Sequence, residues 1–283
     1  MLLPALLLIM KQITGKIYCH LSREDREKYS IKDIRASEAL EVSKFSDLVK
    51  HIAYISYHNP EYALFFRAQS IDYKNSEDYS TILPSIYRIA SSKVYSRKTI
   101  QSRFSVLKQA EEELLSDFRK NRFLGVSKLT KFREMRWAIL QHYEVCGTPL
   151  LDVTHSLRVA CSFALHKPTQ DPYIFVLGLP HPNGSISFYV EQELLNIRLL
   201  SICPPRALRP YFQEGYLVGS FPSQEDTINF RYDFARRMVA KFRLNLDTFT
   251  DRNFSPIPHH TLFPPNDTIK KKCDQIKSVL GVT

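Results

Sequence analysis

Residues 62–70 read Tyr-Ala-Leu-Phe-Phe-Arg-Ala-Gln-Ser, a short apolar run that follows Pro60 and becomes polar from Arg67 onward. A run of this length with these boundaries predicts a buried strand that brings Arg67 to an edge of the core. A second apolar run, Tyr-Ile-Phe-Val-Leu-Gly-Leu at residues 173–179, predicts a central strand. Together the two runs indicate that a buried sheet forms the core.

The rest of the chain alternates between helical and extended patterns. We predict helices from residue 45 to near His58-Asn59-Pro60 and at 99–120, 128–143, 155–165 and 268–280, and further strands at 211–221 and 238–246. Helices dominate the N-terminal half and strands the C-terminal half, which is typical of a single α+β domain with a mostly antiparallel sheet. We expect residues 1–42 to be an N-terminal extension and 43–283 to be the domain, since no long Pro/Gly/Ser linker divides it.

The composition excludes several common classes of enzyme. Only 8 of the 283 residues are Gly, and neither G-x-G-x-x-G nor G-x-x-x-x-G-K-[ST] occurs, which disfavours Rossmann and P-loop proteins. The 5 Cys form no C-x-x-C pair and the 9 His form no H-x-x-x-H pair, so we expect no metal site. Unpaired thiols of this kind are typical of the reducing cytoplasm, where we expect the protein to act.

Residues 1–10 are apolar but do not form a typical signal peptide. They lack a basic n-region and a cleavage site, and ten residues fall short of the roughly 20 needed to span a bilayer. We interpret them as an extension, or as the result of a start codon assigned upstream of Met10. No other stretch approaches a membrane span, so we expect a soluble protein.

Positive charge is concentrated in one part of the chain. The formal net charge is +10, and residues 88–136 hold thirteen Lys or Arg against five Asp or Glu. Two interpretations stay open: solvated basic faces of a helix pair, or a surface for RNA, DNA or an acidic partner.

Several motifs occur in an order that resembles the FRG domain family. They are Phe65-Phe-Arg-Ala-Gln69, Leu140-Gln-His-Tyr143, Thr148-Pro-Leu-Leu-Asp-Val-Thr-His-Ser156, Phe212-Gln-Glu-Gly215 and Leu262-Phe-Pro264. They are similar to the family's F-R-G-Q, Q-H-Y-G, T-R-L-L-D-W-T, Q-Q-G and L-F-P. Ala68, Pro149 and Val153 depart from that pattern. The resemblance covers about residues 43–281.

The motif order is in turn similar to that of ADP-ribosyltransferases of the Arg–Ser–Glu type. These enzymes place an Arg at the end of the first strand, a Ser/Thr motif before a helix and a Glu on a late strand. The corresponding residues are Arg67, Thr154 or Ser156, and Glu214. The resemblance implies an ADP-ribosyltransferase-like sheet, NAD+ as substrate, no metal, and a toxin or antiviral effector with an antitoxin partner.

Each expected role follows from this chemistry. Transfer from NAD+ passes through an oxocarbenium-like centre that Glu214 would stabilise, while Arg67 would hold the phosphates or ribose. His142 would be a general base. Asp152 would bind the cofactor, brace Arg67 or cap the next helix. We expect NAD+ to contact Arg67, Gln69, Tyr143, Asp152, Thr154 and Ser156, and the acceptor to contact Gln213, Arg97, Lys98 and Arg103.

The favoured function is therefore an NAD+-dependent ADP-ribosyltransferase that modifies RNA or DNA, or next a protein. Two alternatives remain. One is a nucleic-acid-binding module that uses the same fold without chemistry, and the other is an NAD+ hydrolase with water as acceptor. Removal of Glu214 separates an enzyme from a binding module.

Overall fold

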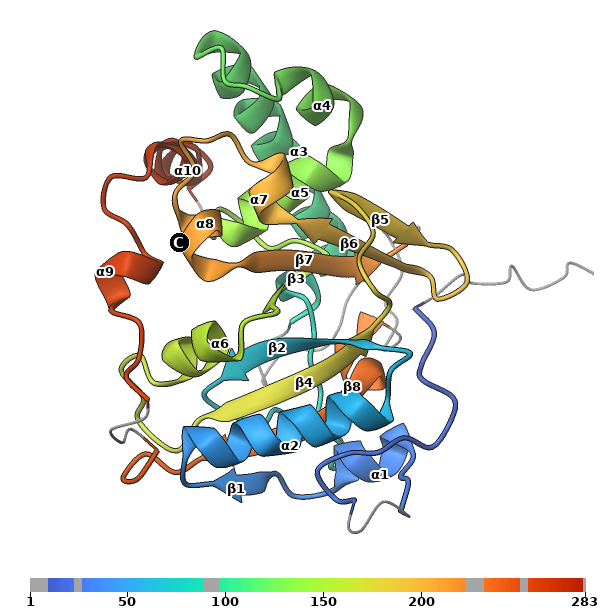
Figure 1. The fold of residues 1–283 in the computed structure, drawn as a ribbon. Helices are drawn as coiled ribbons and strands as arrows, with labels where there is room; N and C mark the ends of the chain where they lie inside the picture. The colour runs from blue at the N-terminus through green and yellow to red at the C-terminus, as the bar shows by residue number, and fades with distance from the viewer. Residues whose placement is uncertain (1–9, 23–26, 89–96, 222–231, 250–253, 282–283) are drawn as a thin grey trace, which may run out of the picture.

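The computed structural model describes residues 10–22, 27–88, 97–221, 232–249 and 254–281 (Figure 1). The helices are α1 (Ile31–Ala36), α2 (Phe45–His58), η1 (Ser85–Tyr87), α3 (Arg97–Lys120), α4 (Val126–Lys131), α5 (Arg133–His142), α6 (Leu157–Ala164), α7 (Leu199–Ile202), α8 (Arg209–Gln213), η3 (Phe234–Arg237), α9 (His259–Leu262) and α10 (Thr268–Val279). The strands are β1 (Leu40–Val42), β2 (Ala63–Gln69), β3 (Leu150–Thr154), β4 (Tyr173–Leu179), β5 (Ile186–Tyr189), β6 (Leu194–Arg198), β7 (Gly215–Ser220) and β8 (Met238–Leu244).

The strands form one sheet in the order β1-β8-β4-β2-β3-β7-β6-β5. β1 runs parallel to β8, and the other neighbouring strands are antiparallel. The predicted central strand at residues 173–179 is β4, which pairs with β2 on one side and β8 on the other. The predicted α+β class with a mostly antiparallel sheet is confirmed.

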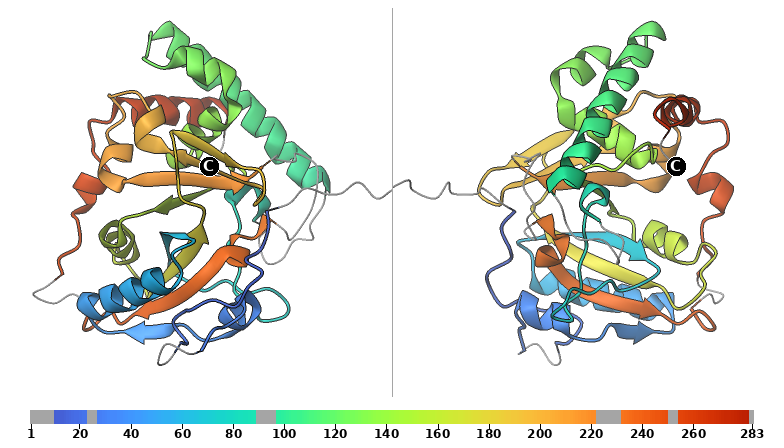
Figure 2. Two further views of the ribbon diagram at one scale, coloured as in Figure 1. Left: turned by 45° about the vertical axis from the view of Figure 1, so that its right-hand side comes forward. Right: turned by 180° about the vertical axis from the view of Figure 1, so that it is seen from behind.

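The sheet divides into two halves between β2 and β3. These strands share a single register pair, Phe66 with Thr154, whereas β2 pairs with β4 over seven residues. The buried apolar residues form two clusters: one is centred on β2, β4 and β8 and also takes in residues of β3, β6 and β7, and the other joins β6 and β7 to α3, α5 and α10. Figures 1 and 2 show α1 and α2 beside the first half and α3, α4 and α5 beside the second. The division leaves the inner edges of β2 and β3 open over most of their length.

The segment before residue 43 contributes to the first half-sheet. Residues 40–42 pair with β8, and Met10, Ile13 and Ile34 are buried in the first core. Residues 1–9 of the predicted extension lie outside the described residues.

Two predicted elements were wrong in their bounds. The helix predicted at 128–143 is two helices, because Phe132 is extended and the Arg136 guanidinium caps the last turn of α4 by bonding the carbonyl of Leu129. The strand predicted at 211–221 begins only at Gly215. Pro210 favours a helical first turn in α8, and Glu214 ends that helix with a left-handed φ of 46°.

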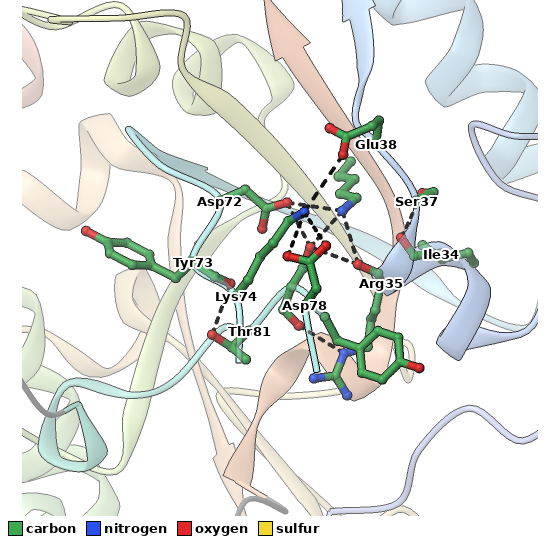
Figure 3. Close-up of polar contacts among 12 residues, drawn as sticks. Ile34, Arg35, Ser37, Glu38, Asp72, Tyr73, Lys74, Asp78 and Thr81 are labelled. Carbon is green, nitrogen blue, oxygen red and sulfur yellow. Dashed lines mark hydrogen bonds and ion pairs between the residues drawn. The ribbon is translucent and has the colours of Figure 1, made fainter. Parts of the chain in front are cut away.

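The loop after β2 is held by a buried lysine. Lys241 on β8 is fully buried, and its Nζ donates to Ser80 Oγ at 2.7 Å, to Asp72 Oδ2 at 3.1 Å and to the carbonyl of Arg35 at 3.2 Å. Figure 3 shows Asp72 within this cluster, beside the exposed pair of Lys74 and Asp78. The ammonium thus has three acceptors, and it fixes the loop that follows Gln69 to β8.

Asp72→Ala is expected to lower the free energy of unfolding by about 3 kcal/mol, because it leaves a buried ammonium without its counter-charge. Asp78→Ala is the matched control and should cost less than about 1 kcal/mol, because its ion pair is exposed. Urea denaturation monitored by circular dichroism measures both. Equal losses in the free energy of unfolding for Asp72→Ala and Asp78→Ala would contradict the role of Asp72 as the counter-charge of Lys241.

Candidate active site

The point where the sheet divides carries Arg67. Beyond the pair of Phe66 with Thr154 the two strands separate, and the Arg67 guanidinium bridges them: its Nη1 donates to the carbonyl of Asp152 at 2.7 Å. Burial, with the nearby positive charge of Arg88, lowers the pKa of Arg67 to about 10. The group is still a cation at neutral pH. Its buried Nε has no hydrogen-bond partner among the described residues.

A cleft of about 530 Å³ opens at this division. Residues of β2, β3, the end of α5, α6, the segment after α6, α8 and the start of β7 line it, together with Phe263. Figure 1 shows α6, α8 and α9 on the same side of the molecule. Its volume lies within the range of small-molecule sites, roughly 300–1,000 Å³.

His142 and Asp152 form a hydrogen-bonded pair in this cleft. His142 Nδ1 lies 3.2 Å from Asp152 Oδ1, and Gln141 Nε2 donates to Asp152 Oδ2 at 2.9 Å. The oxygen of the same amide accepts from Thr148 Oγ1 and Ser85 Oγ, which fixes its orientation. Since a carboxylate only accepts, the imidazole must donate through Nδ1.

Both groups of this pair have shifted pKa values. Burial lowers the pKa of His142, although the bond to Asp152 opposes the shift. Burial by itself would raise the pKa of Asp152, but the bonds from His142 and Gln141 and the charge of Arg67 outweigh it and lower the pKa. The pair is therefore a neutral imidazole and a carboxylate. The Nε2 of His142 is then unprotonated, and it is buried with no hydrogen-bond partner among the described residues. An unprotonated imidazole nitrogen can act as a general base.

Gly215, the first residue of β7, lies close to the side chains of Leu199 and His142. A Cβ on Gly215 would lie 2.9 Å from Leu199 Cδ1 and 3.5 Å from His142 Cε1. A larger residue at the start of β7 would therefore require the Leu199 side chain to move, whereas the His142 ring would be in ordinary contact with it.

Thr154 joins β3 to the turn between α8 and β7. Its hydroxyl lies 3.2 Å from the carbonyls of both Gln213 and Glu214 and accepts from the Ser156 amide at 3.1 Å. Ser156 is the N-cap of α6, with Oγ accepting from the amide of Val159. The prediction that Asp152 caps this helix was wrong, because its carboxylate faces α5 instead.

The cleft brings together six of the residues that the sequence singled out: Arg67, Gln69, His142, Asp152, Thr154 and Gln213. Tyr143, Ser156 and Glu214 are not among its lining residues within the described chain. Tyr143 is buried and donates its hydroxyl to Asp267 at 2.8 Å. Glu214 is exposed and lies between two cleft residues, Gln213 and Gly215.

The three basic residues expected to bind the acceptor lie on α3, and none is among the described residues that line the cleft. Arg103 donates to the carbonyls of Ile86 and Arg88, and so anchors η1. Further along the basic stretch, Arg136 bonds the buried Glu111 at 2.9 Å. Internal contacts therefore use part of the positive charge of residues 88–136. The side chains of Arg97 and Lys98 are exposed.

Sequence reasoning missed Arg209, Glu144 and Lys167, which also line the cleft. Arg209 lies in the segment that contains the Q-Q-G-like motif, so its position beside Gln213 was the available signal. Among the described residues, no three His, Cys, Asp or Glu side chains gather as a metal site requires. No helix in the described part of the chain has the length and apolar composition needed to cross a bilayer.

The family model of the FRG domain matches residues 64–172. The match includes the motifs around Arg67 and from Leu140 to Ser156, and it ends before Gln213 and Leu262. The resemblance predicted from the motifs is thus confirmed for this part of the chain. No curated protein and no solved structure matches the chain.

Proposed function

We propose, from the premise that residues 64–172 are an FRG domain, that this protein is an NAD+-dependent ADP-ribosyltransferase that modifies a macromolecule. The observation that carries the proposal is the Arg67 guanidinium at the division of the sheet, in a cleft that also holds an imidazole with an unprotonated nitrogen. A guanidinium offers paired donors to phosphate oxygens. The cleft therefore combines a group for the dinucleotide with a base for the acceptor.

The chemical step is a substitution at C1′ of the nicotinamide ribose. Nicotinamide leaves with the electron pair of its bond to C1′, and positive charge develops on the ribose. An oxygen or nitrogen atom of the acceptor forms the new bond to C1′, and its proton passes to His142 Nε2. Asp152 stabilises the imidazolium that results.

Glu214 is the carboxylate that we assign to the developing charge. Its side chain is exposed, and its backbone is held by Thr154 between two residues that line the cleft. Residue 214 is therefore adjacent to the cleft lining, and the proposal requires its carboxylate to reach the ribose of a bound NAD+.

The proposed acceptor is RNA or DNA first and protein second, because Arg97 and Lys98 are exposed cations. In the cell, such an activity would serve as a toxin or antiviral effector and would need a neutralising antitoxin in the producing cell.

The test is incubation of the purified protein with NAD+ labelled in the adenylate part, together with total RNA, DNA and lysate protein. We expect label on one acceptor class, loss of that label in Arg67→Ala and Glu214→Gln, and no change in Arg206→Ala. Arg206 is exposed and is not a cleft-lining residue among those described. Nicotinamide release without transferred label would indicate an NAD+ hydrolase. Absence of any NAD+ turnover would favour the binding module.

A further inference from the structure

Arg209 on α8 is the most deeply buried cation of the cleft. The residue is 6 % exposed, and its guanidinium lies 4.6 Å from the ring centroid of Phe263. Its Nη2 donates to Glu144 Oε1 at 2.6 Å. Its backbone amide donates to Asp267 Oδ2 at 2.7 Å. The side chain is therefore held in one position at a wall of the cleft.

Most of the donors of Arg209 are unused. Its Nε and Nη1 are buried and have no hydrogen-bond partner among the described residues. Arg237, a buried arginine outside the cleft, differs: it donates from two nitrogens to the carbonyls of Gly178 and Lys11. Because buried donors in proteins are nearly always paired, the free edge of Arg209 is suited to a ligand.

Arg67 has the same property in the same cleft. Within the described part of the chain, its Nη1 donates to the carbonyl of Asp152, and its buried Nε has no hydrogen-bond partner. Both guanidiniums line the same cleft as the hydrogen-bonded pair of His142 and Asp152. Two cations in one cleft suit a ligand with two negative charges close together.

We propose that Arg209 and Arg67 together bind the diphosphate of a dinucleotide, which, resting on the proposed function, is that of NAD+. The planar fork of a guanidinium donates two parallel hydrogen bonds to phosphate oxygens, and each arginine has such donors unoccupied. Arg209 is then the second arginine of the dinucleotide site, held by Phe263 and Glu144.

Glu144 competes with this ligand. Its carboxylate is the anion paired with Arg209, and 68 % of its side-chain surface is exposed. Neutralising Glu144 removes that competing charge and leaves Arg209 in place. The affinity for a diphosphate should then rise, which is a gain that a misfolded variant cannot produce.

The experiment is calorimetric titration of the full chain with ADP-ribose, inorganic pyrophosphate and adenosine. Arg209→Gln should weaken ADP-ribose and pyrophosphate binding about tenfold or more, the value of a lost charge-assisted hydrogen bond, and leave adenosine binding unchanged. The control Arg206→Gln removes the same charge three residues earlier, outside the described cleft lining, and should change nothing. Glu144→Gln should tighten ADP-ribose binding severalfold.

Equal ADP-ribose affinities in Arg209→Gln and Arg206→Gln would overturn the proposal. The proposal would also be overturned if a single-stranded oligonucleotide displaced ADP-ribose from the wild-type protein and bound more weakly to Arg209→Gln. That result would show that the two arginines bind a nucleic acid. If Arg209→Gln does not fold, the test rests on Glu144→Gln. The proposal is overturned if this variant binds ADP-ribose no more tightly than the wild-type protein does. Binding through Arg209 without nicotinamide release from NAD+ would refute the transferase and keep the diphosphate site. Turnover of NAD+ at the wild-type rate in Arg209→Gln would keep the transferase and refute the diphosphate site.

Discussion

Arg67→Lys is expected to lower NAD+ turnover about a hundredfold or more, although it keeps the positive charge. The guanidinium bridges the divided strands by donating to the carbonyl of Asp152 at 2.7 Å and still has donors for a ligand. An ammonium is a single point charge on a flexible stem and cannot do both. Removing one preorganised donor from a charge-stabilising site typically costs about 10²–10³ in rate.

Nicotinamide release measures this change, with circular dichroism to verify the fold. Arg88→Lys is the matched control, because Arg88 is exposed and is not among the described cleft residues, although its charge reaches Arg67. Its turnover should stay near wild type. Turnover in Arg67→Lys equal to that in Arg88→Lys would show that charge alone matters, and would contradict the bridging role.

Asp152→Asn is expected to lower turnover about a hundredfold. The carboxylate accepts the Nδ1 proton of His142 and leaves Nε2 free to act as a base. An asparagine can instead donate its amide hydrogen to Nδ1, which moves the ring proton to Nε2 and blocks the base. His142→Gln should cost a similar factor, and the double variant should cost little more than either single change, because the two residues act as one unit.

The pH dependence distinguishes this role from a structural one. The base must be neutral, so the rate falls as pH drops through the pKa of His142, which burial lowers from its ordinary value of 6.5. Asp152 raises that pKa, so Asp152→Asn should move the acid limb to lower pH. Arg209 lowers it, so Arg209→Gln should move the limb to higher pH. Shifts in the same direction for both variants would contradict the assignment.

Local sequence patterns were sufficient for the longer elements. The strands at residues 63–69 and 173–179 and the helices α2, α3, α6 and α10 follow from apolar period and length. Patterns failed where a tertiary contact ends an element. Arg136 separates α4 from α5, and a left-handed Glu214 separates α8 from β7. β5 and β6 were also missed, since each is only four or five residues long.

The candidate site was predictable only in part. Arg67, His142 and Asp152 were identified from motifs, because their residue types and order resemble a family. Their mutual roles were not, since the side of β3 that Asp152 faces depends on the packing of α5. For Arg209 the sequence offered only its position in the segment that contains the Q-Q-G-like motif. Its burial and its unused donors exist only once α8, Phe263 and Glu144 surround it.

The sequence by itself determined the fold class and the two buried strands, because hydrophobic period and run length are local properties; it placed Arg67 at the end of the first strand, whereas that strand continues to Gln69. Only the tertiary structure decided that the sheet divides beside Arg67, that His142 donates to Asp152, and that a second arginine lies in the same cleft. Strand pairing and side-chain burial depend on residues far apart in the chain, and no local pattern contains them.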